Sequence, residues 1–340
     1  MVVDPKSSWL STLVAPLSVD EFLSSYWRRQ HLFSHGAADR FSGLLSWTTL
    51  NQILAHHWRE PFRFRLAYLG RDLESGAYAD LGGEAPRIRA NDVTAHLRRG
   101  ATLSFEGIDE VHQPLTRVAE SFEALFRGSI QINIYAAWRG VHGLDLHRDD
   151  EEVFILQIDG RKRWLVYGFS VQGVDRGELQ RSSQAPAGAL LDQVLEPGDL
   201  LYIPQGCYHI AVPMNEPVLH LTVGVKDPGC GVRPRPSFNL PWSATAEGLP
   251  PGRDFVVSLT CKIEGLIDAD PGARSLELRS RGRTYRFPRS MQPIVEQLEK
   301  AAAPLPFERL VDAVAGRLDE AMVRMLLAML MRYELIAIRG

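Results

Sequence analysis

Two short segments with metal-ligating side chains constrain this chain more than any other feature. The first contains His147 and Asp149, whose side chains point to the same side of an extended chain because successive residues alternate faces. The second contains His209, which follows a Pro-Gly-Asp turn and the apolar run Leu200–Ile203. Two imidazoles and one carboxylate form the facial triad that binds Fe(II) and leaves coordination positions open. The sequence therefore predicts that His147, Asp149 and His209 hold iron.

The residues around these two segments are typical of β-structure. The apolar run VFILQI follows the His-x-Asp pair, and KRWLVY comes after Asp159-Gly160. Two apolar runs on either side of Asp-Gly favour a β-hairpin. In the second segment, the order strand, turn, histidine is typical of double-stranded β-helix barrels. Because a His-x-Asp pair occurs by chance in many proteins, the metal prediction depends on these strands.

The same stretch resembles the cupin-like Jumonji C (JmjC) oxygenases, specifically their ribosomal-oxygenase branch. The resembling segments are HRDDEEVFILQIDGRKRW and PGDLLYIPQGCYH, with NIYAAW upstream, HLTVGV downstream and VDEFLSSYWRRQHLF near the start. The resemblance covers most of residues 15–230. It implies an α+β chain whose core is a double-stranded β-helix (cupin or jelly-roll) with helices before it. It also implies a dioxygenase that uses Fe(II), 2-oxoglutarate and dioxygen to hydroxylate a side chain of a protein or peptide, releasing succinate and CO2.

Lys162 is the second residue on which the prediction depends. It shares one face of its predicted strand with Trp164 and Val166. A lysine among inward-facing apolar residues is unfavourable unless an anion pairs with it, and the distal carboxylate of 2-oxoglutarate would be such an anion. By resemblance, Lys162 lies where the family makes this contact. The alternative is an outward lysine in the basic cluster Arg161-Lys162-Arg163.

A predicted strand at residues 129–138 supplies a polar face. Gln131, Asn133 and Tyr135 share that face, which is either exposed to solvent or lines the interior of a barrel. The resemblance places Asn133 at an asparagine that contacts the cosubstrate. It implies less strongly that Thr222, in HLTVGV, also helps to hold 2-oxoglutarate.

Other residues of metal-ligating types are predicted not to bind iron. His142 and His220 are expected to be satisfied core or rim residues, and the adjacent His56-His57 pair diverges on a helix. Cys207 is expected to be a small residue near the barrel rim. No catalytic residue is predicted beyond the metal ligands.

Composition limits the class of protein. The chain has 340 residues, 45% hydrophobic and 23% charged, which is typical of a soluble globular protein with one large and one small domain. A net charge of -3 argues against a whole-surface nucleic-acid binder. No apolar run of membrane-spanning length or signal sequence is present, and three scattered cysteines suggest a reducing compartment. We therefore expect a cytoplasmic protein without a membrane partner.

Two domains joined by a linker or wrapping segment are predicted. Residues 1–230 form the oxygenase domain, with helices at 16–30, 46–56, 91–99 and 114–127. Residues 231–270 are dense in Pro and Gly, which marks a linker or wrapping segment. Residues 271–340 resemble the winged-helix end domain of the ribosomal oxygenases. The resemblance also implies a homodimer, although relatives carry a longer helical dimerisation region after the barrel.

The last domain is predicted to be structural or to dock a partner. The helix expected within DEAMVRMLLAMLMRY corresponds to a recognition helix but lacks the basic face that phosphate contacts require. Direct nucleic-acid binding is therefore not expected.

The substrate is predicted to be a protein or peptide, with a ribosomal protein as the first candidate and a peptide natural-product precursor as the second. The acidic run Asp150-Glu151-Glu152 beside the metal ligands would favour a basic substrate segment if it faced the site. The alternative is that these acids lie on the outer surface or pair with arginines. Two other functions remain open: a non-redox cupin metalloenzyme, and a non-catalytic cupin-like binding module.

Overall fold

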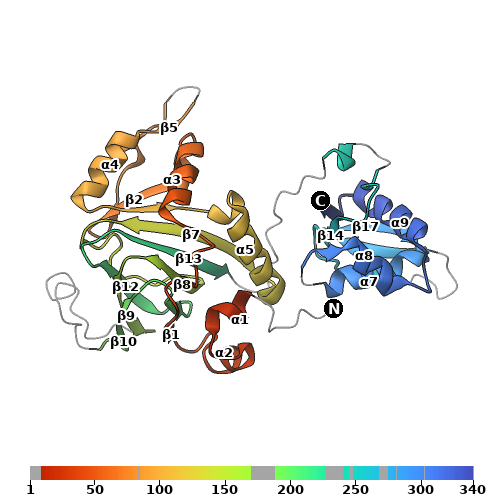
Figure 1. Cartoon of the computed structure of the whole chain (residues 1–340), viewed down its shortest axis with the longest axis horizontal. Helices are drawn as coiled ribbons and strands as arrows, with labels where there is room; N and C mark the ends of the chain where they lie inside the picture. Colours follow the sequence, from red (N-terminus) through yellow and green to blue (C-terminus); the bar gives the residue numbers. More distant parts are fainter. Residues whose placement is uncertain are drawn as a thin grey trace. The chain divides into compact units, whose positions relative to one another are not determined.

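The chain divides into two compact units between residues 230 and 231, where the oxygenase domain was predicted to end (Figure 1). The computed structural model describes residues 9–82, 85–169, 188–226, 240–244, 248–267, 275–280, 282–301 and 303–339. Each unit has its own hydrophobic core. Cys230, one of the three cysteines, lies outside the described residues.

The N-terminal unit is built on two antiparallel sheets. The larger sheet has eight strands in the order β1-β11-β8-β13-β7-β6-β2-β3, and the smaller has the order β10-β9-β12. The larger sheet comprises β1 (Leu32–Ser34), β2 (Phe64–Tyr68), β3 (Arg71–Asp72), β6 (Thr102–Phe105), β7 (Ser129–Ala137), β8 (Glu152–Asp159), β11 (Leu200–Ile203) and β13 (Val218–Lys226). The smaller sheet comprises β9 (Lys162–Gly168), β10 (Leu191–Leu195) and β12 (Tyr208–Pro213), and a separate ribbon pairs β4 (Ala79–Asp80) with β5 (Arg87–Ile88).

The predicted hairpin around Asp159-Gly160 is wrong. Strand β8 pairs with β11 and β13 in the larger sheet, whereas β9 pairs with β10 and β12 in the smaller one. Gly160 has φ of 64°, and a Cβ there would meet the carbonyl oxygen of Pro217 at 2.0 Å. The Asp-Gly turn therefore reverses the chain as predicted, but it carries the chain from one sheet to the other.

Helices cover one face of the larger sheet. They are α1 (Trp9–Val14), α2 (Val19–Ser25), α3 (Trp47–His56), α4 (Ala90–Arg99) and α5 (Gln113–Phe126), with short 3-10 turns η2 (Pro61–Arg63), η3 (Ser75–Ala77) and η4 (Ile108–Glu110). Ser18 and Ser46 are the N-caps of α2 and α3, because their hydroxyls accept backbone hydrogen bonds from Glu21 and Thr49. Helix α2 ends earlier than predicted, at Ser25, and the chain then passes through Arg28 at a φ of 60°.

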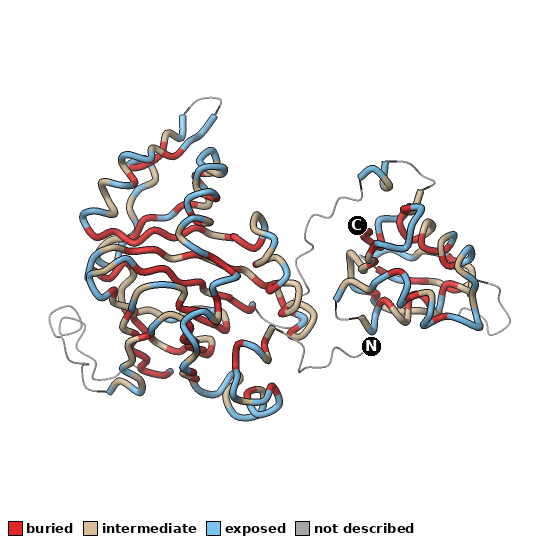
Figure 2. The backbone as a smooth tube through the Cα atoms, viewed as in Figure 1, coloured by how far each residue is buried: buried red, intermediate tan, exposed pale blue. Residues whose placement is uncertain are grey.

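Alternation along β13 separates two environments. Leu219, Leu221 and Val223 point into the large core beneath the helices, together with Phe154 and Leu156 of β8. Val153 and Ile155 of β8 instead pack with Trp164 and Val166 of β9, in a second cluster between the sheets. Figure 2 shows the buried residues concentrated along these strands. The metal-ligand candidates lie on this second, inter-sheet side.

Among its described residues, the C-terminal unit combines two three-stranded sheets with three α-helices. Its elements are η5 (Trp242–Ala244), β14 (Val256–Leu259), β15 (Gly265–Ile267), β16 (Ser275–Ser280), β17 (Arg283–Pro288), η6 (Arg289–Met291), α7 (Gln292–Lys300), β18 (Leu305–Pro306), α8 (Phe307–Val314), α9 (Glu320–Arg332) and β19 (Ile336–Arg339). The sheet orders are β18-β14-β19 and β15-β16-β17. Strands β14 and β15 lie within the segment 231–270 that was predicted to be a linker, so its second half belongs to this unit.

Among the described residues, no helix is both long enough and apolar enough to cross a membrane.

Candidate metal centre

The three predicted iron ligands lie together. One ligand atom from each of His147, Asp149 and His209 falls within 4.8 Å of the other two. The Asp149 carboxylate lies 3.6 Å from His147 Nε2 and 3.5 Å from His209 Nε2. These separations suit three donors arranged around one ion at about 2.0–2.2 Å from each. Residues more than sixty positions apart in sequence are thus placed at one point.

Backbone hydrogen bonds between the two segments fix this geometry. The amide of His147 donates to the carbonyl of His209 at 3.1 Å, and the amide of His209 donates back at 2.9 Å. Beside this bridge, Gly206 N donates to the Asp149 carbonyl at 2.8 Å. A bulge between Tyr208 and His209 shifts the register of β12 against β9. Such irregularities commonly re-aim a side chain next to an active site.

The two imidazoles are oriented for metal binding. His147 Nδ1 lies 2.7 Å from the carbonyl oxygen of Asp145, and His209 Nδ1 lies 3.0 Å from that of Cys207. A carbonyl only accepts, so each Nδ1 carries the proton and each Nε2 offers its lone pair toward the site. Burial, and then the neighbouring His147, lowers the pKa of His209 to about 4, which favours the neutral, ligating imidazole. The donor set therefore fits a divalent transition metal.

Lys162 points inward, as the functional prediction required. Its side chain is only 5% exposed, whereas the flanking Arg161 and Arg163 pair outside with Glu216 and Asp192 at 3.0 and 2.6 Å. No carboxylate forms an ion pair with Lys162 in the part of the chain that the structure describes. Burial lowers the pKa of Lys162 to about 7, because the ammonium ion loses its hydration. A buried lysine without an internal anion fits an anionic ligand.

The polar face of β7 lies on the same side of the sheet. Ile130, Ile132 and Ile134 are buried in the core, while the residues between them are half-buried. Asn133 Oδ1 accepts hydrogen bonds from Gly107 N at 3.0 Å and from Gln131 Nε2 at 3.2 Å. This leaves the Nδ2 group of Asn133 as the donor available to a ligand.

Thr222 lies directly opposite Asn133, on the neighbouring strand β13. The next pair along the same face, Tyr135 and His220, stacks with ring centroids 5.0 Å apart. The structure therefore places Thr222 and Asn133 side by side. Their contacts with 2-oxoglutarate stay a prediction.

The acidic run does not act as one surface. Glu152 is 2% exposed and points to the helix side, where it accepts a hydrogen bond from the Tyr202 hydroxyl and lies 3.4 Å from Arg28 Nε. Glu151 lies 3.3 Å from Lys226 Nζ at the end of β13. Asp150 alone is exposed. The interpretation that these acids pair with arginines is thus correct for Glu152, whereas Glu151 pairs with a lysine.

The spare histidines and Cys207 lie outside the triad. The prediction that His142 and His220 are satisfied is wrong, because the buried His142 Nε2 and His220 Nδ1 have no hydrogen-bond partner among the described residues. His142 is buried, and burial lowers its pKa; His57 Nδ1 lies 2.8 Å from Glu60 Oε1. Burial raises the pKa of Cys207 to about 11, which keeps it a thiol at neutral pH. Its side chain packs in the cluster between the sheets.

One polar network was not predicted from the sequence. On β2, Arg65 lies 2.8 Å from Asp72 and 3.3 Å from Glu106, all partly exposed. Arg65 alternates with the buried Phe64 and Leu66, so it shares the inter-sheet side with the polar face of β7. The alternation in FRFRLAYL indicates that Arg65 points away from the core. That Arg65 shares a face of the sheet with Asn133 follows only from the order of the strands.

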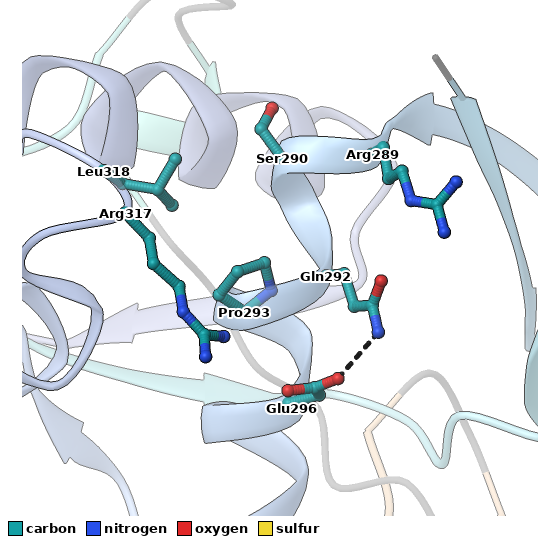
Figure 3. A pocket seen from close by; sticks show the side chains of 7 residues that line it. All are labelled: Arg289, Ser290, Gln292, Pro293, Glu296, Arg317 and Leu318. Atoms are coloured by element: carbon teal, nitrogen blue, oxygen red, sulfur yellow. Dashed lines mark hydrogen bonds between the residues drawn. The ribbon is translucent and has the colours of Figure 1, made fainter. Parts of the chain in front are cut away.

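The C-terminal unit has a surface pocket of its own. Figure 3 shows its lining, which comes from η6, α7 and the segment between α8 and α9. Within it, Gln292 Nε2 donates to Glu296 Oε1 at 2.8 Å. It contains none of the predicted site residues.

Comparison with known proteins gives consistent matches. Residues 110–231 match the model of the JmjC domain. The chain is 28% identical over 219 residues to "Ribosomal oxygenase 2" of Rattus norvegicus, covering 61% of this chain and 44% of that protein. It is 28% identical over 217 residues to "Bifunctional lysine-specific demethylase and histidyl-hydroxylase NO66" of Drosophila persimilis, covering 63% and 31%. The chain thus spans less than half the length of the curated relatives it matches.

A solved structure shares the fold over nearly the whole chain. The ribosomal oxygenase YcfD from Escherichia coli superposes with a TM-score of 0.54 at 17% identity, covering 96% of this chain and 99% of that one. A second YcfD structure, in complex with cobalt and 2-oxoglutarate, gives the same TM-score. The JmjC cupin fold, with mixed helices and strands, is therefore confirmed.

Proposed function

Because the chain carries a JmjC domain of the ribosomal-oxygenase branch, we propose that it is an Fe(II)- and 2-oxoglutarate-dependent dioxygenase that hydroxylates a side chain of a protein or peptide. The observation that carries this proposal is the joint presence of the His147-Asp149-His209 triad and the buried Lys162 on one side of the sheet. A triad with three protein donors leaves room for a chelating cosubstrate and dioxygen. The buried cation supplies the partner for an anion.

Different residues would bind the metal and the cosubstrate. His147, Asp149 and His209 would hold iron, which, when bound with 2-oxoglutarate, would supply the chemistry of oxygen activation. The carbonyls of Asp145 and Cys207 keep both imidazoles in the ligating tautomer. Lys162 would pair with the distal carboxylate of 2-oxoglutarate, and Asn133 and Thr222 would position it from the adjacent strands.

The accessibility of the triad indicates where a substrate would approach. His209 is buried, whereas His147 and Asp149 remain about one-third exposed. A bulky protein side chain could thus reach the metal from the side of the 147–149 segment. Ile155, Trp164 and Ile203 pack in the apolar cluster between the sheets, which would exclude water from the cosubstrate site.

We propose a protein or peptide substrate rather than a free metabolite. The names of the relatives support a ribosomal protein as the first candidate, and a peptide natural-product precursor remains the second. A double-stranded β-helix core, a winged-helix-like C-terminal unit and a cytoplasmic location stay part of this proposal. The strand order β18-β14-β19 with α7, α8 and α9 supports the winged-helix-like interpretation. Homodimerisation also stays a proposal.

The decisive experiment is a search for the product. The protein is incubated with Fe(II), 2-oxoglutarate and host lysate peptides, and mass spectrometry detects a gain of one oxygen atom. We expect the gain with the native chain and not with Asp149→Ala. A non-redox metalloenzyme or a binding module would leave every peptide mass unchanged in both samples.

A further inference from the structure

Two buried ring nitrogens without hydrogen-bond partners lie beside Lys162, the residue predicted to contact the cosubstrate. Lys162 is 5% exposed, Trp164 5% and His220 2%. Trp164 Nε1 and His220 Nδ1 have no hydrogen-bond partner among the described residues, and Lys162 has no carboxylate partner there. Buried polar groups in folded proteins are nearly always hydrogen-bonded. Two such groups next to a buried lysine without a carboxylate partner therefore indicate a site built for a ligand.

Ring contacts connect these groups to each other and to the metal ligands. The Trp164 ring lies 6.0 Å from the His209 ring and 5.6 Å from the His220 ring, measured between centroids. Lys162 Nζ lies 5.5 Å from the centroid of the Trp164 ring. The Trp164 ring thus lies close to both the metal ligand His209 and the buried ammonium group.

Strand parity explains why the three side chains converge. Lys162 and Trp164 are two residues apart on β9, so they project to the same face. His220 projects from β13 between the core residues Leu219 and Leu221, which point to the opposite face. The two strands belong to different sheets, so these side chains meet in the space between the sheets.

We propose that Trp164 and His220 donate two uncharged N–H hydrogen bonds to the distal carboxylate of 2-oxoglutarate, beside the ammonium group of Lys162. This assignment rests on the proposed function. It makes the two rings binding residues rather than packing residues. The carboxylate then receives donors from both sheets, whereas the keto-acid end lies at the metal.

The charge of the pocket agrees with uncharged donors. Burial, and then the positive charge of Lys162, lowers the pKa of His220 well below its ordinary value, so the imidazole is neutral at neutral pH. His220 stacks almost parallel on Tyr135, with an interplanar angle of 9°, which fixes the plane of its ring. One cation and two neutral donors balance a single carboxylate without burying a second positive charge.

The test compares the affinities for two keto acids with the Mn(II)-loaded full chain by calorimetry, without oxygen. 2-Oxoglutarate carries the distal carboxylate, and 2-oxobutyrate lacks it. Trp164→Phe removes the N–H and keeps an aromatic ring; His220→Phe keeps the stack on Tyr135 and removes both ring nitrogens. A hydrogen bond to a charged group is strong, so each variant should bind 2-oxoglutarate about tenfold more weakly or worse. Binding of 2-oxobutyrate should change by less than about twofold.

Two further variants keep the result interpretable. Asn places an amide nitrogen near the position of His Nδ1, so His220→Asn should recover much of the affinity that His220→Phe loses. Trp242→Phe, in the C-terminal unit, should change neither affinity. Equal losses for both keto acids, or unchanged 2-oxoglutarate binding in Trp164→Phe and His220→Phe, would overturn the inference. Failure of the native chain to bind 2-oxoglutarate would instead contradict the proposed function.

Discussion

The two faces of the larger sheet differ in how their polar groups are satisfied. On the helix side, the buried Glu152 is bonded to Tyr202 and lies near Arg28. On the inter-sheet side, Lys162 and His220 are also buried, yet among the described residues His220 Nδ1 has no hydrogen-bond partner and Lys162 has no carboxylate partner. A satisfied polar group stabilises the fold, whereas an unsatisfied one lowers stability until a ligand arrives. Buried polar residues on the helix face of the sheet thus stabilise the fold, whereas those on the inter-sheet face are available to bind a ligand.

Loss of a metal ligand should have the largest effect on the inter-sheet side. Asp149→Ala or His209→Ala removes one of three protein donors, so iron binding should fall by orders of magnitude while the free energy of unfolding changes little. Metal content after dialysis against Fe(II), measured together with urea unfolding, checks this. The exposed His56→Ala is the control and should retain iron. Full iron content in both triad variants would refute the assignment.

Substitutions at two neighbouring residues of β13, Leu221 and Thr222, compare the two faces of the sheet most directly. Leu221 is fully buried under the helices, and Leu221→Ala should lower the free energy of unfolding by about 2–5 kcal/mol with little change in the affinity for 2-oxoglutarate. Thr222→Ala should do the reverse, weakening 2-oxoglutarate binding with a change in stability of about 1 kcal/mol or less. Urea unfolding and calorimetry on both variants test the comparison. It fails if the two variants change the same quantity.

Lys162→Met should weaken the binding of 2-oxoglutarate and raise the stability of the protein without cosubstrate. The variant removes a buried cation that has no internal anion, so the protein without cosubstrate should become more stable by about 1–4 kcal/mol. The apparent 2-oxoglutarate requirement should rise strongly, because a charge-assisted hydrogen bond contributes roughly 1.5–3 kcal/mol. Iron binding should remain nearly unchanged. Lower stability together with an unaltered 2-oxoglutarate requirement would mean that the lysine has another role.

The same lysine predicts a dependence of stability on pH. Its folded-state pKa is about 7 against an ordinary value of 10.5, so in this window the unfolded state binds more protons than the folded state. The free energy of unfolding should therefore rise with pH between about 7 and 10, by up to a few kcal/mol. The measurement is the difference between the native chain and Lys162→Met in urea at several pH values. Parallel curves would contradict the depressed pKa.

The acidic run should give the smallest functional effects. Glu152→Gln weakens a buried pair on the helix side and should lower stability by about 1–3 kcal/mol without changing metal or 2-oxoglutarate binding. The exposed Asp150→Asn should leave stability unchanged and weaken capture of a basic peptide slightly, more at low salt. Binding of a basic peptide at two salt concentrations tests the second part. If Glu152→Gln weakened peptide capture and left stability unchanged, the roles assigned to Glu152 and Asp150 would be wrong.

Features that depend on a short stretch of sequence could be predicted, whereas the pairing of distant strands could not. The triad could be predicted because His147 and His209 each flank a recognisable strand, and the inward direction of Lys162 followed from its parity with Trp164. The pairing of β8 could not be predicted, since an Asp-Gly turn specifies a reversal of the chain but not the sheet that the next strand joins. Glu152 was predictable from parity, because the alternation through Phe154 and Leu156 places it on the helix side.

The most direct test of the proposed activity is the conversion of 2-oxoglutarate itself. The native chain, His209→Ala and Lys162→Met are incubated with Fe(II), dioxygen and 2-oxoglutarate, and succinate is quantified with and without a candidate ribosomal peptide. We expect succinate from the native chain, a further increase with a true substrate, none from His209→Ala, and recovery in Lys162→Met only at high 2-oxoglutarate. Succinate formed equally by the native chain and His209→Ala, or by neither under any condition, would contradict the proposed oxygenase.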